Sequence, residues 1–529
     1  MPIPDYVELY RAGRLQEAAA ACERRLSERP DAADARLYLG LTMLRQAQAR
    51  PAIKCLKVID GAIDGHALLA TLRTGLDGHD LDLQSAMALG GFLRTTFARL
   101  QPRCDQPVAD RYINVLGSSH ARSFGTHPIF FPLFIAIGRT CLVLTEPLFQ
   151  ATRRKFLENL ARLDGSQDII VMLGGDPRLH LENLAGTRPG GGPDLTDADR
   201  RLMRVAAARY GEILREIKQQ VSGRLILYNV LPTFDLRVNE LTRFMNDELK
   251  RVCAEIDVIF LDICDAILDP RSGLLRQDVA AVAFKGDFHL NDSALPIVLD
   301  RLRELGVLDD DADRACGFRW SYVFGYSVSP GEESRIWCEP DVSPSNALTS
   351  DKVACSLLAN SALDYLSVNL LNRTDARVLM VNVKEGYLPL NAPAGLMARC
   401  VAVADNAEYA RMARRIAHFS GRTDIEFTTF GTPDMERLRE AAFDLVVVNL
   451  HPDTLAEDCR RAHEVLARVS AETMHVLSPQ PDAIAKLGPA ARRVDRILTI
   501  GNHHIPAKWR QFSVHFGPMS PAVASKAVA

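Results

Sequence analysis

The run VLGSSHARSF, residues 115–124, contains the local pattern from which the central fold is inferred. An apolar segment typical of a buried strand ends in a turn of small residues, and Ser119 lies at its tip. The end of a strand holds such a hydroxyl rigidly, and a helix that begins behind it points N–H groups at a developing negative charge. The run therefore predicts a strand–turn–helix unit of an α/β domain with a nucleophilic serine.

A second segment, KGDFHLN at residues 285–291, supplies a histidine and an acidic residue. Asp287 stands two positions before His289 and is placed to orient and activate that imidazole as a base for Ser119. Asp262, which follows an apolar run, is a second acidic candidate, although a residue that merely ends a strand is typical of that position.

These segments resemble blocks of the SGNH (GDSL-like) hydrolase superfamily. The resemblance makes Ser119 the nucleophile, with Ser118 where the family has Asp, and it makes His289 the base and Asp287 the residue that orients it. The family spaces this Asp and His three positions apart, whereas here the gap is two. The fold that the resemblance implies is an SGNH-type parallel α/β sandwich.

A polar turn between these blocks extends the resemblance. The run IIVMLGGDPRLH, residues 169–180, ends a buried strand and resembles a further block of the family. Its candidate oxyanion-binding and substrate-binding residues are Gly174, Asp176, Arg178 and His180. The oxyanion donors are Arg178 or His180, or else the backbone N–H groups of Ser119 and Gly138, the latter resembling the glycine of the second block. Purely structural roles are the alternative, with Arg178 paired to Asp176 and His180 held in the core.

The activity that this resemblance implies is serine-dependent ester hydrolysis or acyl transfer. An acylated small molecule, glycan or glycoconjugate is the substrate class that the superfamily suggests. Such chemistry requires no cofactor, and no metal site is predicted.

Composition narrows the class of protein. The 529 residues are 47% hydrophobic and 24% charged, so several ordinary globular domains are expected. A formal net charge of −3 argues against a nonspecific nucleic-acid binder. The 11 cysteines contain no Cys-x-x-Cys pair, which favours reduced thiols in the cytoplasm. No signal peptide is expected, and the longest apolar run, residues 129–137, is too short to span a membrane.

Residues 1–105 are predicted to form helices. The runs at 6–18 and 35–41 have helical spacing, and they resemble tetratricopeptide repeats. Only two such units are visible, whereas at least three are normally needed to bury a continuous core. A groove that binds a protein partner and a helical cap docked on the rest of the chain are both open.

Residues 106–308 alternate strand and helix patterns. Strands are expected at 113–116, 140–144, 169–173, 225–230 and 258–261, and helices at 151–163, 195–221 and 237–255. This alternation predicts a parallel sheet covered on both faces. Residues 309–345, which begin with acidic residues and continue with aromatic ones, are interpreted as a linker.

Residues 346–510 show a second α/β pattern, followed by a tail at 511–529. Strands are expected at 377–381, 401–405, 443–449 and 474–477. The ladder resembles the Rossmann-like core of class I S-adenosylmethionine methyltransferases. That resemblance implies S-adenosylmethionine as cofactor, with Gly386, Asp405 and Asn449 as the residues that bind it.

The first loop of this second pattern departs from the family. It reads NVKEGY at residues 382–387, so Gly386 is its one glycine, and the acidic residue expected near Met380 is missing. Weak cofactor binding or none is therefore expected. The alternatives to the hydrolase are thus a methyltransferase, with the central domain as its recognition module, and a non-catalytic scaffold.

Overall fold

The computed structural model describes most of the chain. The described residues are 4–59, 62–79, 81–97, 111–117, 119–124, 127, 129–134, 157, 160–161, 163–172, 177, 180–181, 195–280, 289–309, 322–327, 335–340, 363–364, 366–371, 373, 375–383, 386–431, 438, 442–450, 454–477, 487, 497–499 and 513–515. The chain forms two compact units: unit 1 comprises Met1–Asp105 and Ala354–Ala529, and unit 2 comprises Gln106–Val353. In the described part, no helix combines the length and apolar character needed to cross a membrane.

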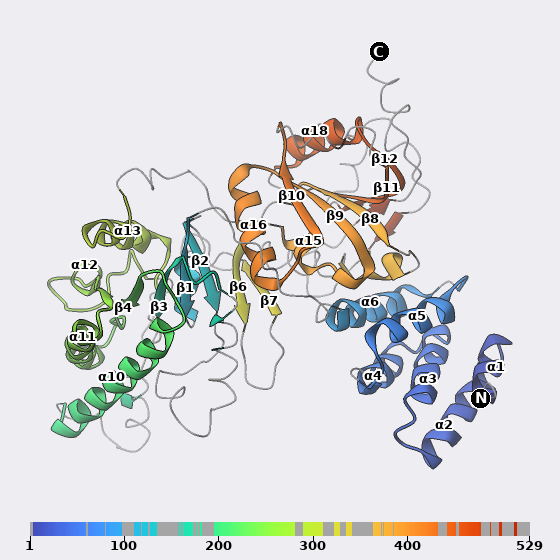
Figure 1. Cartoon of the computed structure of the whole chain (residues 1–529), viewed down its shortest axis with the longest axis horizontal. Coiled ribbons are helices and arrows are strands. Elements are labelled where there is room, and N and C mark those ends of the chain that lie inside the picture. Colours follow the sequence, from blue (N-terminus) through green and yellow to red (C-terminus); the bar gives the residue numbers. More distant parts are fainter. Residues whose placement is uncertain are drawn as a thin grey trace. The chain divides into compact units, whose positions relative to one another are not determined.

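Unit 2 is built around a parallel sheet (Figure 1). Among the described residues its strands, in spatial order, are β2 (Phe130–Phe134), β1 (Ile113–Gly117), β3 (Asp168–Met172), β4 (Leu225–Tyr228) and β5 (Ile259–Leu261). Every neighbouring pair runs parallel. The central strands are apolar and buried, as a parallel sheet covered on both faces requires. A separate antiparallel pair joins β6 (Tyr322–Ser327) to β7 (Arg335–Pro340).

The helices of unit 2 begin with side-chain caps at two places. The described helical segments are η2 (Ser119–Phe124), α10 (Asp197–Lys218), α11 (Leu236–Ile256), α12 (Cys264–Ile267), η4 (Asp292–Ala294) and α13 (Leu295–Glu304). Before α10, the Thr196 hydroxyl accepts from the N–H of Asp199 at 3.3 Å, and the Asp199 carboxylate accepts from the N–H of Thr196 at 2.8 Å. This reciprocal capping box satisfies two donors at the start of the helix. Asp235 caps α11 by accepting from the N–H of Arg237.

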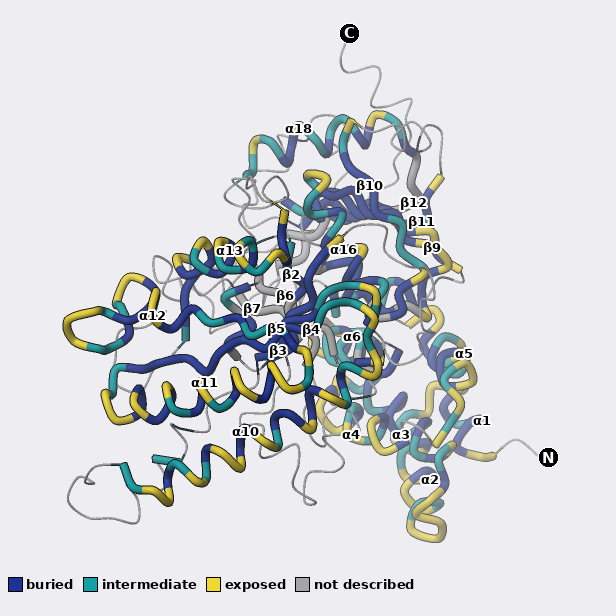
Figure 2. The backbone as a smooth tube through the Cα atoms, turned by 60° about the vertical axis from the view of Figure 1, so that its left-hand side comes forward, coloured by how far each residue is buried: buried dark blue, intermediate teal, exposed yellow. Residues whose placement is uncertain are grey.

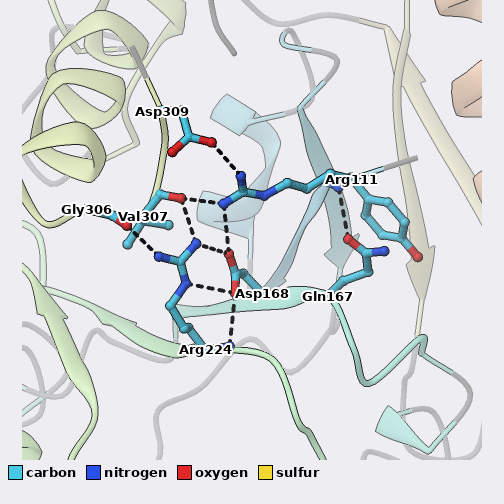
Figure 3. A network of polar contacts seen from close by, with 8 residues as sticks. Arg111, Gln167, Asp168, Arg224, Gly306, Val307 and Asp309 are labelled. Atoms are coloured by element: carbon cyan, nitrogen blue, oxygen red, sulfur yellow. Dashed lines mark hydrogen bonds and ion pairs between the residues drawn. The ribbon is translucent and has the colours of Figure 1, made fainter. Parts of the chain in front are cut away.

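A polar network fastens the amino end of the unit 2 sheet (Figure 3). Asp168, the first residue of β3, accepts from Nε and Nη2 of Arg224 at 3.1 and 2.7 Å. Arg224 also donates to the carbonyl oxygens of Gly306 and Val307, which follow α13. Arg111, just before β1, donates to the same Val307 oxygen at 2.7 Å. The network therefore ties the starts of three strands to the end of a helix.

Six helices form the N-terminal part of unit 1 as described. They are α1 (Asp5–Arg11), α2 (Leu15–Glu28), α3 (Ala33–Arg45), α4 (Ala49–Ile59), α5 (Gly65–Leu76) and α6 (Leu83–Phe97). Buried tyrosines join the helices: Tyr6 donates to the Asp34 carboxylate at 2.5 Å, and Tyr10 donates to the carbonyl oxygen of Gly75. The tetratricopeptide-like interpretation of this segment stays a prediction.

The C-terminal part of unit 1 contains the second parallel sheet (Figure 1). Its described strands, in spatial order, are β10 (Ile425–Thr429), β9 (Met397–Ala404), β8 (Ala376–Val381), β11 (Ala442–Asn449) and β12 (Ser470–Leu477). All four pairings are parallel. The crossovers contain α15 (Tyr387–Asn391), η6 (Ala394–Leu396), α16 (Ala407–Ser420) and α18 (Leu455–Leu466). A small antiparallel pair joins β13 (Ile497–Thr499) to β14 (Ser513–His515).

The core of this sheet follows from its apolar strands. Leu379, Val381, Val446 and Val448 pack in one buried cluster with α18. The intervening residues are buried as well, and α16 packs against β9 and β10. Figure 2 shows these strands as buried, whereas α10 and α11 of unit 2 alternate between buried and exposed residues, as amphipathic helices do.

The N-terminal helices bond directly to a helical stretch that precedes β8. Arg73 of α5 donates to the carbonyl oxygens of Leu371 and Arg373, both at 2.8 Å. Arg94 of α6 pairs with Asp364 at 2.8 Å. A Cβ added at Gly90 would lie 1.7 Å from the carbonyl oxygen of Asp364, so only glycine permits this approach. The helices are thus an integral layer of unit 1.

The predicted fold class is confirmed at the level of an α/β chain with two parallel sheets and many helices. The SGNH-type description and the predicted domain boundaries stay predictions. Two strands of the parallel sheets were missed, β2 and β10, and both lie at sheet edges. The antiparallel strands β6, β7, β13 and β14 were not predicted either. β2 contains Pro132, which lacks an N–H and is tolerated in an edge strand. The strand expected at 140–144 lies outside the described residues.

Candidate functional site

The strand order of unit 1 has a switch point at β8. β9 pairs on one side of β8 and β11 pairs on the other, so the crossovers diverge there. In open parallel sheets, ligands bind in the crevice at the carboxyl ends of the strands beside such a point. The segments that follow β8, β9 and β11 therefore form the candidate site.

The loop after β8 has a positive φ, the backbone conformation that favours glycine, at both of its ends. Asn382 has a φ of 58° and Gly386 a φ of 84°. Among residues with a Cβ, asparagine is one of those that tolerate positive φ best. A Cβ at Gly386 would also lie 2.8 Å from Cβ of Ala413 and 3.0 Å from the Phe427 ring. Backbone conformation and packing both require glycine at this position. Residues 384–385 lie outside the described part.

The side chain of Asn382 is fully buried at the switch point. Its Nδ2 donates to the carbonyl oxygen of Asp458, in α18, at 3.0 Å, and this contact settles which way the amide faces. Its Oδ1 has no hydrogen-bond partner among the described residues. A buried unpaired acceptor costs about 1–3 kcal/mol. This atom is therefore a place where a donor from a ligand or a water molecule would be stabilised.

Asp405, directly after β9, forms an ion pair at the same edge. Its Oδ2 accepts from Nη1 of Arg461 at 3.2 Å. Arg461 projects from α18, and its Nε lies 3.1 Å from the Glu457 carboxylate. Its guanidinium carbon lies 5.6 Å from the ring centre of Phe430, which follows β10. The guanidinium thus ties α18 to the carboxyl ends of two strands.

Asn449 is the last residue of β11 and is partly buried. The next N–H, that of Leu450, donates to the carbonyl oxygen of Leu477 at 2.8 Å, which aligns the ends of β11 and β12. The structure therefore places all three predicted cofactor residues, Gly386, Asp405 and Asn449, in segments that leave the carboxyl ends of adjacent strands. Their binding roles stay predictions.

In unit 2, the structure brings the segment after β1 next to the segment around residue 289. Ser119 is the first residue of η2, and the ring of His120 stacks on the ring of His289 with 4.8 Å between centroids. Asp287 lies outside the described residues, as do Gly138, Gly174, Asp176 and Arg178. None of these placements tests the catalytic or oxyanion-binding roles predicted from the sequence.

His180, another predicted site residue of unit 2, contacts the cap of α10. Its Nε2 lies 2.7 Å from Oδ1 of Asp199. Burial raises the pKa of Asp199, but the hydrogen bonds from His180 and Thr196 outweigh it and lower this pKa to about 2. The contact connects His180, in the segment after β3, to the start of α10.

Sequence reasoning missed two residues of the unit 1 edge, Asn382 and Arg461. Arg461 follows Glu457 and Asp458 at helical spacing, so its pattern indicates ion pairs within one helix. Its contact with Asp405 joins residues 56 positions apart, and no local pattern encodes it. Asparagine at the end of an apolar strand was the available signal for the positive φ at residue 382. Among the described residues, no cluster of His, Cys, Asp or Glu is suited to hold a metal ion.

Comparisons with known proteins give low-similarity matches. No protein-family model matches the chain, and no curated protein sequence matches it. Among solved structures, the YcgJ protein of Bacillus subtilis is 20% identical over 20% of this chain and 45% of its own length, less than half, with a TM-score of 0.17. An rRNA methylase from Streptococcus thermophilus is 13% identical over 28% of this chain and 88% of its own, with a TM-score of 0.22. A SAM-dependent methyltransferase from Aquifex aeolicus is 15% identical over 30% and 89%, with a TM-score of 0.23.

These comparisons contradict the expected main activity. The two structures above that are named by activity are a methylase and a methyltransferase and not the predicted serine-dependent ester hydrolase or acyltransferase, so the findings favour the methyltransferase alternative. The small-residue turn at Ser119 suits any strand end in an α/β sheet, which is why it did not identify the chemistry. TM-scores of 0.17 to 0.23 carry no conclusion about this chain by themselves. The proposal below rests on the geometry of unit 1.

Proposed function

We propose that the protein is an S-adenosylmethionine-dependent methyltransferase whose cofactor site lies at the carboxyl end of the unit 1 sheet. The observation that carries the proposal is the loop after β8, where Asn382 and Gly386 both have positive φ at the switch point of the strand order. Positive φ at both residues turns the backbone sharply at the end of β8, where open parallel sheets bind their ligands.

The residues at the carboxyl end of this sheet fit an adenosyl cofactor in two respects. The unpaired, buried Oδ1 of Asn382 is an acceptor that a ligand N–H or O–H would satisfy. Asp405 follows the neighbouring strand, where a carboxylate is placed to accept from ribose hydroxyls. Gly386 fixes the turn beside them, because a Cβ there would clash with Ala413 and Phe427.

When bound, the cofactor supplies an electrophilic methyl group on a sulfonium ion. The chain itself would hold the ribose through Asp405. Asn449, at the end of β11, would border the side on which the acceptor approaches. Holding two reactants in line is a large part of what an enzyme contributes to a transfer reaction of this kind.

The remaining regions complete the proposal. Residues 106–308, with the parallel sheet of unit 2, would recognise the methyl acceptor. Residues 1–105 would brace the cofactor domain, as the bonds from Arg73 and Arg94 to residues 364–373 indicate, and would offer their outer surface to a protein partner. Hydrolysis and acyl transfer form no part of this function.

Calorimetric titration of the full-length chain with S-adenosylmethionine and S-adenosylhomocysteine tests the proposal. Full length is needed because α5 and α6 bond to the segment before β8. We expect a dissociation constant of about 1 μM, which corresponds to about −8 kcal/mol. Asp405→Asn should weaken binding about tenfold or more, because a neutral amide is a poorer acceptor than a carboxylate.

Asp375→Asn is the matched control for this titration. Asp375 is exposed at the opposite edge of the sheet and has a φ of 54°, which asparagine also adopts. Its substitution should leave binding unchanged. Absence of binding of either nucleoside to the unmodified protein at millimolar concentration would refute the proposed function.

A further inference from the structure

Two neighbouring arginines of α18 have different surroundings. Arg460 is largely exposed, and its ion pairs, to Glu457 and Glu464, stay within the helix. Arg461 is only 20% exposed on its side chain, and it reaches out of the helix to Asp405. Both arginines contact Glu457, but only Arg461 of the two also contacts the carboxyl end of the sheet.

The guanidinium of Arg461 is held from several directions. Glu457 binds its Nε at 3.1 Å, and the Phe430 ring lies 5.6 Å from its central carbon. Asp458, fully buried on its side chain, lies 3.9 Å from Nη1. A planar guanidinium that is anchored on two sides has little rotational freedom left. It presents Nη1 to Asp405 in one orientation.

The carboxylate of Asp405 is correspondingly constrained. Its side chain is 6% exposed, and its Oδ2 accepts from Nη1 at 3.2 Å. Nη1 of Arg461 occupies one of the about four lone-pair positions that a carboxylate offers. Two adjacent hydroxyl groups of a ribose are donors of the right kind for a carboxylate held in this way.

We infer that Arg461 is a positioning residue that orients Asp405 toward the ribose of the nucleoside ligand, and that the pair selects ligands with an intact ribose diol. This inference rests on the proposed function. Arg461 would act through Asp405 rather than through its own contact with the ligand. A residue that merely braced the edge would affect stability, and it would affect every nucleoside ligand equally.

The test compares S-adenosylhomocysteine with its 2′-deoxy analogue by calorimetric titration of the full-length protein. We expect the unmodified protein to prefer the ribose form by about tenfold or more, as loss of a hydrogen bond to a charged group implies. Asp405→Asn and Arg461→Met should each remove most of this preference. The double variant should be no worse than either single one, because the two side chains act as a unit.

Two further variants separate orientation from structure. Arg460→Met is the matched control on the next residue of α18, and it should keep the full preference. Arg461→Lys retains the charge, but one ammonium cannot reproduce the fixed fork that contacts Glu457 and Asp405 together, so part of the preference should remain. If Arg461→Met fails to fold, the lysine variant carries the test alone. Melting temperatures are measured for all variants.

The outcomes distinguish the inference from the function on which it rests. Binding of neither ligand to the unmodified protein overturns the proposed function. Equal binding of the ribose and deoxy forms, or an undiminished ribose preference in both Arg461 variants, overturns the inference and leaves the function in place. A lower melting temperature with unchanged preference also overturns it, because it assigns Arg461 a bracing role only. Loss of the preference in Arg461→Met, with Arg460→Met unchanged, supports it.

Discussion

The two units fasten the amino ends of their parallel sheets in the same way but at different depths. In unit 1, Arg422 binds both oxygens of Asp424 at 2.7 Å and donates to two carbonyl oxygens at the end of α15, and its side chain is fully buried. In unit 2, Arg224 binds Asp168 and two carbonyl oxygens after α13, but its side chain is 37% exposed (Figure 3). Water can replace lost bonds at the second site and not at the first.

A third arginine shows that the role of an arginine–aspartate pair depends on the end of the sheet at which it lies. Arg461 pairs with Asp405 at the carboxyl end of the unit 1 strands, the edge at which open parallel sheets bind ligands. Arg422 and Arg224 lie at the amino ends of the strands in their respective sheets. An arginine–aspartate pair is therefore a brace at one edge and a candidate part of a binding site at the other.

The largest effect is expected for Arg422→Met. The substitution leaves Asp424 and two carbonyl oxygens without their buried donor, so the free energy of unfolding of unit 1 should fall by about 3–5 kcal/mol. Denaturant titration, with hydrogen exchange followed over residues 386–431, measures it. Arg399→Met is the control: it removes an exposed ion pair between Arg399 on β9 and Glu426 on β10, and it should cost less than about 1 kcal/mol. An equal effect of the two substitutions would show that burial does not govern the brace.

An intermediate effect on the free energy of unfolding of unit 1 is expected when the pH is lowered. Burial, with a smaller contribution from the charge of Arg373, lowers the pKa of His475 in β12 to about 3. In the unfolded chain, His475 is protonated below its ordinary pKa of about 6.5, whereas in the folded chain it stays neutral down to about pH 3. Its full contribution to the free energy of unfolding is therefore present above about pH 6.5. It is lost as the pH falls from about 6.5 toward 3, by about 2 kcal/mol at pH 5.

In unit 2, the loss of stability on acidification begins at a lower pH than in unit 1. The pKa of Asp199 is lowered to about 2, so the stability that its ionised form contributes is present above its unfolded pKa near ~4 and is lost below it. Hydrogen exchange at pH 7 and pH 5 should therefore show unit 1 weakened before unit 2. His475→Gln should flatten the pH dependence of unit 1. Equal weakening of both units at pH 5 would contradict the comparison.

The smallest effect is expected for Arg224→Met in unit 2, about 1.5 kcal/mol. Its site is partly exposed, and Arg111 lies 3.9 Å from the same Asp168 carboxylate, so the charge keeps a partner (Figure 3). The measurement is the same denaturant titration, with exchange followed around β3 and β4. A loss as large as that of Arg422→Met would reverse the order of the two braces.

Sequence patterns predicted much of the fold and less of the site. The buried strands β1, β3, β4, β8 and β11 follow from continuous apolar runs, which are typical of parallel sheets. The edge strand β10, IEFTT, was missed because its mixed sequence lacks such a run. At the candidate site, Gly386 and Asp405 were predicted from their places after strands. Ser119 was interpreted too strongly, since a small-residue turn at a strand end is compatible with many activities.

The sequence by itself determined the central strands of both sheets and the long helices of unit 2, because apolar periodicity and helix caps act over a few neighbouring residues. It also determined that Gly386 stands in a strand-to-helix turn. Only the tertiary structure decided that Arg461 meets Asp405, that Asn382 is buried with an unpaired Oδ1, and that Arg73 and Arg94 secure the N-terminal helices to the segment before β8. These contacts join residues far apart in the chain, and they exist only when the strand order brings the segments together.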